Sequence, residues 1–309
     1  MKPALSVVLF TVLSGAGLGL FSLLVAADLL RLGEPLSPTA RLAGGLAAVA
    51  LVAGGLVSSV FHLANPKNAW RAFSQFRHSW LSREGVVSVA FFPFALAYLA
   101  AVYAGADTGA RALTGVPALA LGWAVLLCTG MIYACLKTIP QWHSWLTPAN
   151  YFVLGHASGA LALVLIAHLD RKSIDPLALV AVLLFAMAAA FKAAYYWRAR
   201  KVSGRHTLAG AVGMTAAQVK LLDVGHSHGT FLTREFIYGF GQRHATELRI
   251  LAVVAAFAVP LIVLGAAPTS LAALAVACGT CLVGLTVERW LFFAEAEHVV
   301  RLYHGQLRV

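Results

Sequence analysis

A histidine and a glutamate stand at the two ends of one loop in this 309-residue chain. His62 closes an apolar run and Glu84 opens the next one, so both should lie at the same level where the two runs form neighbouring helices. An imidazole and a carboxylate that converge there can accept and donate protons. The arrangement therefore predicts a shallow site for proton-coupled chemistry at the edge of an apolar region.

The loop between these two residues is both aromatic and basic. Aromatic residues recur every three or four positions with cations among them: Trp70, Phe73, Phe76, Trp80, Lys67, Arg71 and Arg77. This pattern predicts an amphipathic helix that lies in a membrane interface. A titratable pair beside it suits a lipid-soluble substrate that gives up electrons and protons together, and quinol is the obvious one. Arg83 could steer the quinol headgroup or simply reach water.

Glu84 lies in a WLSRE stretch that is nearly repeated as FLTRE further along the chain. The simplest interpretation is that Ser82 and Thr233 cap helices and that each acid lies in a first turn, where it complements the helix dipole. The histidine and the aromatic loop accompany only the first copy. We therefore expect a proton site at Glu84 and a partner-facing helix start at Glu235.

Membrane helices are the elements that must position these residues. The chain is 60% hydrophobic and 11% charged, whereas soluble domains average about 25% charged residues. A span needs about 20 apolar residues, which predicts an all-α integral membrane protein with eight transmembrane helices in a single membrane domain, 1–309. The expected spans are residues 5–30, 40–64, 85–105, 116–139, 149–168, 175–197, 249–267 and 270–291, with a long basic loop at 198–248.

The cations gather on one side of this topology. Of the 23 lysines and arginines, the other side holds only Arg31, Arg41, Arg111, Arg171 and Lys172. The positive-inside rule then places both termini in the cytoplasm. A basic docking surface for a partner protein would produce the same bias. Either cause explains the net charge of +11 without nucleic acid as a partner.

The two halves of the chain resemble each other. VLSGAG in the first span is similar to VLGHAS in the fifth, and Cys128 in the fourth span matches Cys278 in the eighth. Two four-helix halves would share an orientation and form a parallel repeat. All four cysteines lie in apolar runs, which favours packing over a metal site, so no metal is expected.

Four stretches together resemble the dimethyl sulfoxide reductase anchor subunits, the DmsC family. They are FHLANPKNAWRAFSQFRHSWLSRE, MIYACLKTIPQW, GHSHGTFLTREF and ERWLFFAEAEH, and the likeness extends over essentially the whole chain. The resemblance implies an eight-helix anchor in the bacterial inner membrane, within a complex of three subunits. Its partners would be a molybdenum catalytic subunit and an iron–sulfur subunit with four 4Fe–4S clusters, docked on the basic face.

The resemblance also implies roles for particular residues. The anchor would bind menaquinone or ubiquinone, carry no haem or metal of its own, and exchange electrons with the nearest cluster. Glu84 would take or relay a quinol proton, and His62 would hydrogen-bond a quinol oxygen. Arg83 could steer the quinone headgroup, and Tyr133 could border the quinone because of its position at the basic-side end of its span. The chain would thus be the quinone-reactive subunit of an oxidoreductase complex, with either direction of electron flow.

Two alternatives make other demands on the chain. A haem-b-containing quinone-reactive anchor needs two axial histidines, for which His62 and His156 are conceivable, although polar helix packing suits His156 better. A repeat-built secondary transporter needs charged, interrupted segments at mid-membrane, and the sequence offers no matching pair.

The other charged residues of the spans are expected at the interface. Asp28 and Lys192 can extend to it. Glu288 and Arg289 are adjacent in sequence, so they should not face each other on a helix.

Overall fold

The computed structural model describes residues 3–61, 63, 65–214, 219, 222–223, 244–266, 270–304 and 308–309. Within these ranges, eight helices are long and apolar enough to cross a membrane, and no strand is formed. The prediction of an all-α membrane protein with eight spans is therefore confirmed.

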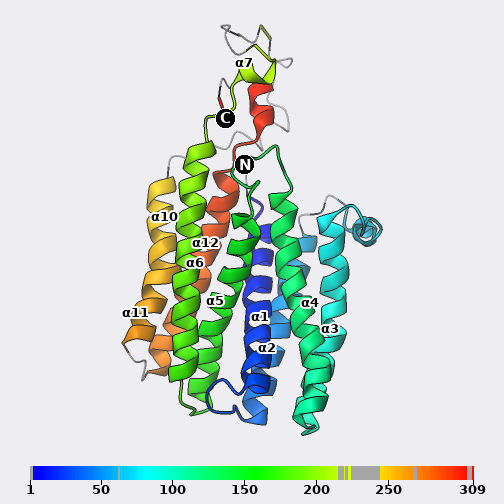
Figure 1. Ribbon diagram of the computed structural model, residues 1–309, viewed down its shortest axis with the longest axis vertical. Helices are drawn as coiled ribbons and strands as arrows, with labels where there is room; N and C mark the ends of the chain where they lie inside the picture. The colour runs from blue at the N-terminus through cyan, green and yellow to red at the C-terminus, as the bar shows by residue number, and fades with distance from the viewer. Residues whose placement is uncertain are drawn as a thin grey trace.

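The spans form one elongated bundle (Figure 1). They are α1 (Leu5–Leu30), α2 (Pro38–Val60), α3 (Trp80–Tyr103), α4 (Thr108–Ala134), α5 (Leu146–Leu169), α6 (Asp175–Val202), α10 with η2 and α11 (Ala245–Val253, Val254–Ala258 and Val259–Gly265), and α12 (Leu271–Ala294). The shorter helices are η1 (Pro66–Phe73), α7 (Leu208–Ala211) and η3 (Val299–His304). We call the end where α3 and α5 begin and α4, α6 and α12 end the basic end; both chain termini lie there (Figure 1).

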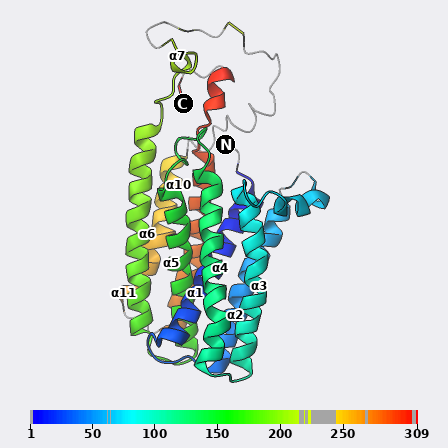
Figure 2. The same cartoon turned by 45° about the vertical axis from the view of Figure 1, so that its right-hand side comes forward.

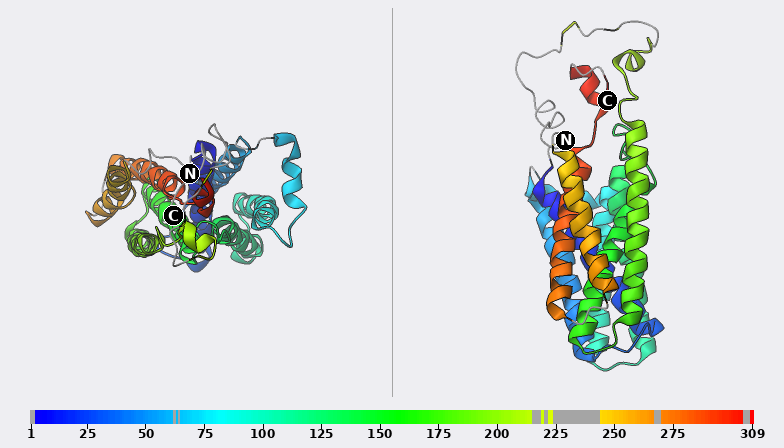
Figure 3. Two further views of the ribbon diagram at one scale, coloured as in Figure 1. Left: turned by 90° about the horizontal axis from the view of Figure 1, so that it is seen from above. Right: turned by 90° about the vertical axis from the view of Figure 1, so that its left-hand side faces the viewer.

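Helix α1 forms the centre of the bundle. It packs on α2, α4, α5 and α12, and most of its length is buried. Its crossing with α5 is built on glycines, because a Cβ at Gly19 or Gly159 would collide with the backbone of the other helix. Small residues are the usual means by which membrane helices approach this closely. Seen from above, α1 and α5 occupy the middle, with η1 far to one side and α11 to the other (Figure 3).

The helix pairs of the two halves match. Helix α1 packs on α2 as α5 packs on α6, and α3 packs on α4 as α10 and α11 pack on α12. The cross-contacts correspond too, since α4 meets α5 and α12 meets α1. A parallel repeat would produce these pairings, but the duplication itself stays a prediction.

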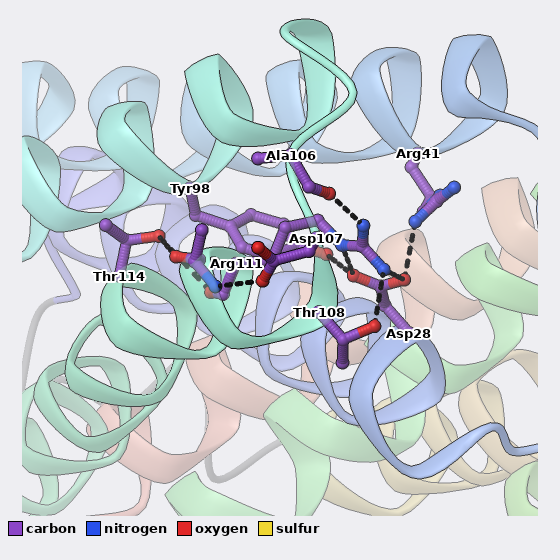
Figure 4. A network of polar contacts seen from close by, with 9 residues as sticks. Asp28, Arg41, Tyr98, Ala106, Asp107, Thr108, Arg111 and Thr114 are labelled. Atoms are coloured by element: carbon purple, nitrogen blue, oxygen red, sulfur yellow. Dashed lines mark hydrogen bonds and ion pairs between the residues drawn. The ribbon is translucent and has the colours of Figure 1, made fainter.

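The carboxylate of Asp28, whose side chain is only 6% exposed, joins the helices at the end opposite the basic end. Asp28 accepts hydrogen bonds from Arg41 at 2.5 Å, from Arg111 Nε at 2.9 Å and from the Tyr98 hydroxyl at 3.0 Å (Figure 4). These partners come from α2, α4 and α3, so one carboxylate on α1 joins four helices. Asp28 is thus engaged by two arginines of neighbouring helices, and its position at the interface stays a prediction.

Candidate functional site

Glu84 lies inside the bundle, near the basic end. It is one turn into α3, only 4% exposed, and its Oε1 is hydrogen-bonded to the Thr129 hydroxyl on α4. The hydroxyl oxygen of Thr129 also lies 2.9 Å from the carbonyl oxygen of Val125. A buried carboxyl group with a hydroxyl partner and a nearby interface is a site at which a proton can be held or released.

Thr129 can accommodate both protonation states of this carboxyl group. A hydroxyl has a single proton to donate. When Glu84 is ionised, Thr129 donates to it. When Glu84 is protonated, it can donate to the Thr129 oxygen, and Thr129 then donates to the carbonyl of Val125. The local geometry therefore keeps a hydrogen bond to Glu84 in either state.

The start of α3 differs from the expectation. Its N-cap is Ser79, whose hydroxyl accepts a hydrogen bond from the backbone N–H of Ser82. The Ser82 hydroxyl instead accepts from the backbone N–H of Gln75. The prediction that Ser82 caps the helix is wrong, and the helix begins earlier than residue 85. Because α3 begins at Trp80, Glu84 lies beyond its first turn, in the buried part of the bundle.

The loop between α2 and α3 forms the expected amphipathic segment, as a 3₁₀ helix. Helix η1 projects sideways from the basic end (Figure 2) and exposes Trp70 and Phe73. Phe73 nevertheless reaches α3, because a Cβ at Gly85 would lie 3.3 Å from its ring. Gly85 directly follows Glu84 in the sequence, so the Phe73 ring packs on α3 one residue away from the buried acid.

Two of the other predicted site residues are described, and one is not. Arg83 is half-buried, stacks on Trp80 and donates hydrogen bonds to the carbonyls of Phe76 and Arg77 at 3.1 and 2.7 Å. These contacts fasten the loop to α3, and the quinone role of Arg83 stays a prediction. His62 lies outside the described residues, so its pairing with Glu84 also stays a prediction. Glu235 and the GHSHGT histidines lie outside them as well.

Tyr133 lies between Glu84 and an aromatic cluster. It is one turn beyond Thr129 on the same face of α4. Its ring stacks on Tyr151 with centroids 5.6 Å apart and meets Trp142, Phe292 and Phe293 edge-on. Thr129, one turn away, is the hydrogen-bond partner of Glu84. The role of Tyr133 toward a quinone stays a prediction.

A buried ionic cluster was missed by the sequence analysis. Arg289 Nε donates to Glu288 Oε2 at 2.5 Å, and Lys192 forms an ion pair with Glu288 Oε1. All three side chains are buried where α6 and α12 approach the basic end. The expectation that Glu288 and Arg289 do not face each other is wrong, because the two side chains form a direct hydrogen bond. Lys192 does not extend to the interface either, since Glu288 holds it inside.

His156 has the contacts of a packing residue. Trp123 Nε1 donates to its Nε2 at 3.0 Å, and its Nδ1 lies 2.8 Å from the carbonyl oxygen of Phe152. Both ring nitrogens are thus engaged, and neither is left to ligate an iron. This geometry favours polar helix packing over the haem alternative. Among the described residues, no three His, Cys, Asp or Glu side chains gather as a metal-ligand set.

Comparison with known proteins identifies two similarities. The family model for the DMSO reductase anchor subunit (DmsC) matches residues 1–294. A curated protein of Allochromatium vinosum, one of the subunits of a sulfite dehydrogenase, is 34% identical over an alignment of 321 residues. The alignment covers 98% of this chain and 99% of that protein. Both similarities span the eight membrane helices together with the Glu84 site.

Proposed function

The chain belongs to the DMSO reductase anchor subunit family, and from this premise we propose that it binds a quinone at Glu84 and exchanges electrons with its iron–sulfur partner. Family membership makes the chain the membrane anchor of a molybdoenzyme complex, with a catalytic and an iron–sulfur subunit. The quinone would be menaquinone or ubiquinone of the surrounding membrane. The proposal assigns no haem or metal to this subunit.

The buried carboxyl group of Glu84 is the observation that carries the proposal. Glu84 is only 4% exposed and lies within a transmembrane helix, where an ionisable group is costly to bury. Such a residue is by default a candidate functional group. Glu84 is bonded to Thr129 and lies beside the interfacial η1 segment, through which a lipid-soluble headgroup would approach. When quinol is oxidised it loses two electrons and two protons. Glu84 would accept one proton, and His62 would bind a quinol oxygen and accept the other.

The basic end is the proposed docking face of the iron–sulfur subunit. Electrons would pass between the quinone and the nearest cluster, so the quinone site and the docked partner should share one end of the bundle. Complementary charge would steer the association. Cations on the described part of this end include Lys67, Arg71, Arg77, Arg200, Lys201 and Arg205. We place this end in the cytoplasm, with the bundle in the bacterial inner membrane.

The name of the A. vinosum relative favours one direction of electron flow. A sulfite dehydrogenase takes electrons from its substrate, and a complex of that kind would pass them to quinone. Glu84 would then deliver a proton to the reduced quinone instead of accepting one. The arrangement of Thr129 and Val125 serves both directions, because it supports either protonation state of Glu84.

Glu84→Gln tests the proposal in the intact complex, reconstituted in lipid nanodiscs. Quinone-coupled turnover should fall by about 100-fold or more, because the amide cannot carry the proton. Turnover with a viologen dye, which exchanges electrons with the partner subunits directly, should be unchanged. The matched control is Glu247→Gln, which alters an exposed acid on α10. Parental quinone-coupled turnover and quinone binding in Glu84→Gln would refute the assignment.

A further inference from the structure

An open groove runs along the surface of α5 and α6, toward the basic end. Its volume is about 630 Å³, and it is lined by Trp145, Leu146, Met187, Ala190, Phe191, Ala194, Trp197 and Arg198. The lining residues of α6 recur every three or four positions, so they form one stripe along that helix. Met187, Ala190 and Trp197 are exposed, so the groove opens toward the lipid of the membrane.

The length of the groove matches one leaflet of a membrane. From Met187 to Arg198, α6 rises about 16 Å, at about 1.5 Å per residue. One leaflet contributes half of a hydrocarbon core that is about 30 Å thick. Two alanines of the lining, Ala190 and Ala194, lie between these ends and leave room for a chain. The groove is thus long enough for one acyl chain of one leaflet.

Two tryptophans mark the end of the groove that lies at the membrane surface. Trp145, directly before α5, and Trp197, in the last two turns of α6, are 67% and 63% exposed. Trp145 also meets Phe191 edge-on, with ring centroids 5.8 Å apart, and so walls one side of the groove. Exposed tryptophans of membrane helices gather at the interface, where the ring contacts hydrocarbon and the indole N–H reaches the headgroups. The groove therefore extends from headgroup level into one leaflet.

The headgroup end of the groove is positively charged. Arg198 donates to the carbonyls of Pro140 and His143 at 3.0 and 2.6 Å, and these neutral partners fix its guanidinium without cancelling its charge. Lys201 lies one turn beyond Trp197, with its Nζ 3.5 Å from the centre of that ring. The ion pairs formed among the described residues include neither cation, and no acid is part of the described lining. An anionic group at this end would therefore meet two uncompensated cations.

Quinone chemistry has no proton acceptor in this groove. Arg198 is the only titratable side chain in its described lining, and a guanidinium does not release its proton in proteins. Glu84 lies on α3, which packs on α2, α4 and η1. Figures 1 and 2 show α3 and α6 on opposite flanks of the bundle. The groove is therefore a second site, separate from the one proposed for the quinone.

We propose that the groove binds a phospholipid with a net negative headgroup, with one acyl chain along α6 and the phosphate beside Arg198 and Lys201. Basic pockets between membrane helices favour such lipids, and each cation near the membrane surface strengthens the attraction. A phosphatidylglycerol keeps the charge of its phosphate, whereas a phosphatidylcholine cancels it with an ammonium group. The bound lipid fills the groove between α5 and α6 and gives the two cations a counter-charge. It does so whether or not a quinone binds at Glu84.

Native mass spectrometry of the detergent-purified complex tests the headgroup preference. The complex is titrated with phosphatidylglycerol and, separately, with phosphatidylcholine of identical chains, and the dissociation constant of the tightest site is measured for each. We expect phosphatidylglycerol to bind about tenfold more tightly or better. Lys201→Gln should weaken phosphatidylglycerol binding about fivefold and leave phosphatidylcholine binding unchanged, because it removes one cation. Arg200→Gln is the matched control, because this exposed cation lies beside Lys201 in the sequence but off the lining stripe.

Ala190→Trp tests the groove itself without touching a charge. Ala190 is exposed and lies in the middle of the lining stripe, so an indole there should occupy the place of the acyl chain. Phosphatidylglycerol binding should weaken about tenfold or more, because each acyl methylene that loses its contact weakens binding. Ala193→Trp is the control, since Ala193 is also exposed on α6 but lies outside the lining.

An electron-microscopy map of the complex, in nanodiscs that contain both lipids, gives an independent readout. The parent should show a chain-like density along Ala190 with headgroup density beside Lys201, and Ala190→Trp should lose both. Equal affinity of the parent for the two lipids, or unchanged phosphatidylglycerol affinity in Ala190→Trp, would overturn the proposal. A quinone in the groove of the parental map would overturn it as well.

Discussion

At the residue scale, Glu288 decides the stability of the ionic cluster. It lies between Lys192 and Arg289, so the three buried side chains carry more positive than negative charge. Lys192 lies over the rings of Tyr195 and Tyr196 as well, which lessens the cost of its burial. Arg289 lies over the rings of Tyr151 and Phe292 too, but aromatic faces do not supply the full negative charge of the Glu288 carboxylate.

Glu288→Gln should therefore destabilise the bundle strongly. It leaves two buried cations without a counter-charge, a change that typically costs about 3–5 kcal/mol. Lys192→Met should cost less, because it leaves the Glu288–Arg289 pair intact and replaces the lysine stem with one of similar shape. Thermal unfolding in detergent measures both. A Lys192→Met variant less stable than Glu288→Gln would contradict this ranking.

At the element scale, the glycine crossing of α1 and α5 fixes the positions of both halves. Gly159→Ala places a methyl against the backbone of Gly19 and Leu20, where neither atom can move aside. We expect a loss of about 1–3 kcal/mol, the usual cost of overpacking, seen as a lower melting temperature of the anchor. Gly54→Ala adds the same methyl to an open surface and should be neutral. Equal melting temperatures for the two variants would show that the crossing is not tightly packed.

The number and type of the elements were predictable, but their exact starts were not. Eight long apolar runs predict eight spans whatever their partners, because a bilayer demands helices of that length. Where α3 begins depends on the choice between Ser79 and Ser82 as its cap, and the turn at Gln75 decides it by engaging Ser82. With Ser79 as the cap, Glu84 lies within the helix and is buried, whereas with Ser82 it would lie at the helix end. The local sequence alone does not distinguish the two caps.

The site was only partly predictable for a similar reason. Glu84 was found because an acid beside an aromatic, basic loop is conspicuous in the sequence. Thr129 was missed, because a threonine within an apolar run resembles ordinary packing until α3 and α4 are brought together. Lys192 and Glu288 were each visible, but their pairing joins α6 to α12 and no spacing along the chain reveals it. A lysine and an acid deep in two different spans are nevertheless a signal to seek a pair.

At the scale of the whole molecule, the bundle presents two chemically different ends. At the end opposite the basic end, two of the cations, Arg41 and Arg111, form ion pairs with Asp28. At the basic end, many cations lie on loops and helix ends outside the core. The two ends thus differ in their number of cations, and Asp28 neutralises part of the charge of the less basic end.

This difference yields a prediction about orientation that can be tested in cells. The positive-inside rule places the basic end in the cytoplasm, and both chain termini lie at that end (Figure 1). A green fluorescent protein fused after Val309 should therefore fluoresce, whereas an alkaline phosphatase fused there should be inactive. Fusions in the turn between α3 and α4, near Gly105, should give the reverse pattern, because this turn lies at the opposite end. Active phosphatase after Val309 would place the basic end, and with it the proposed docking face for the iron–sulfur subunit, on the outer side of the membrane.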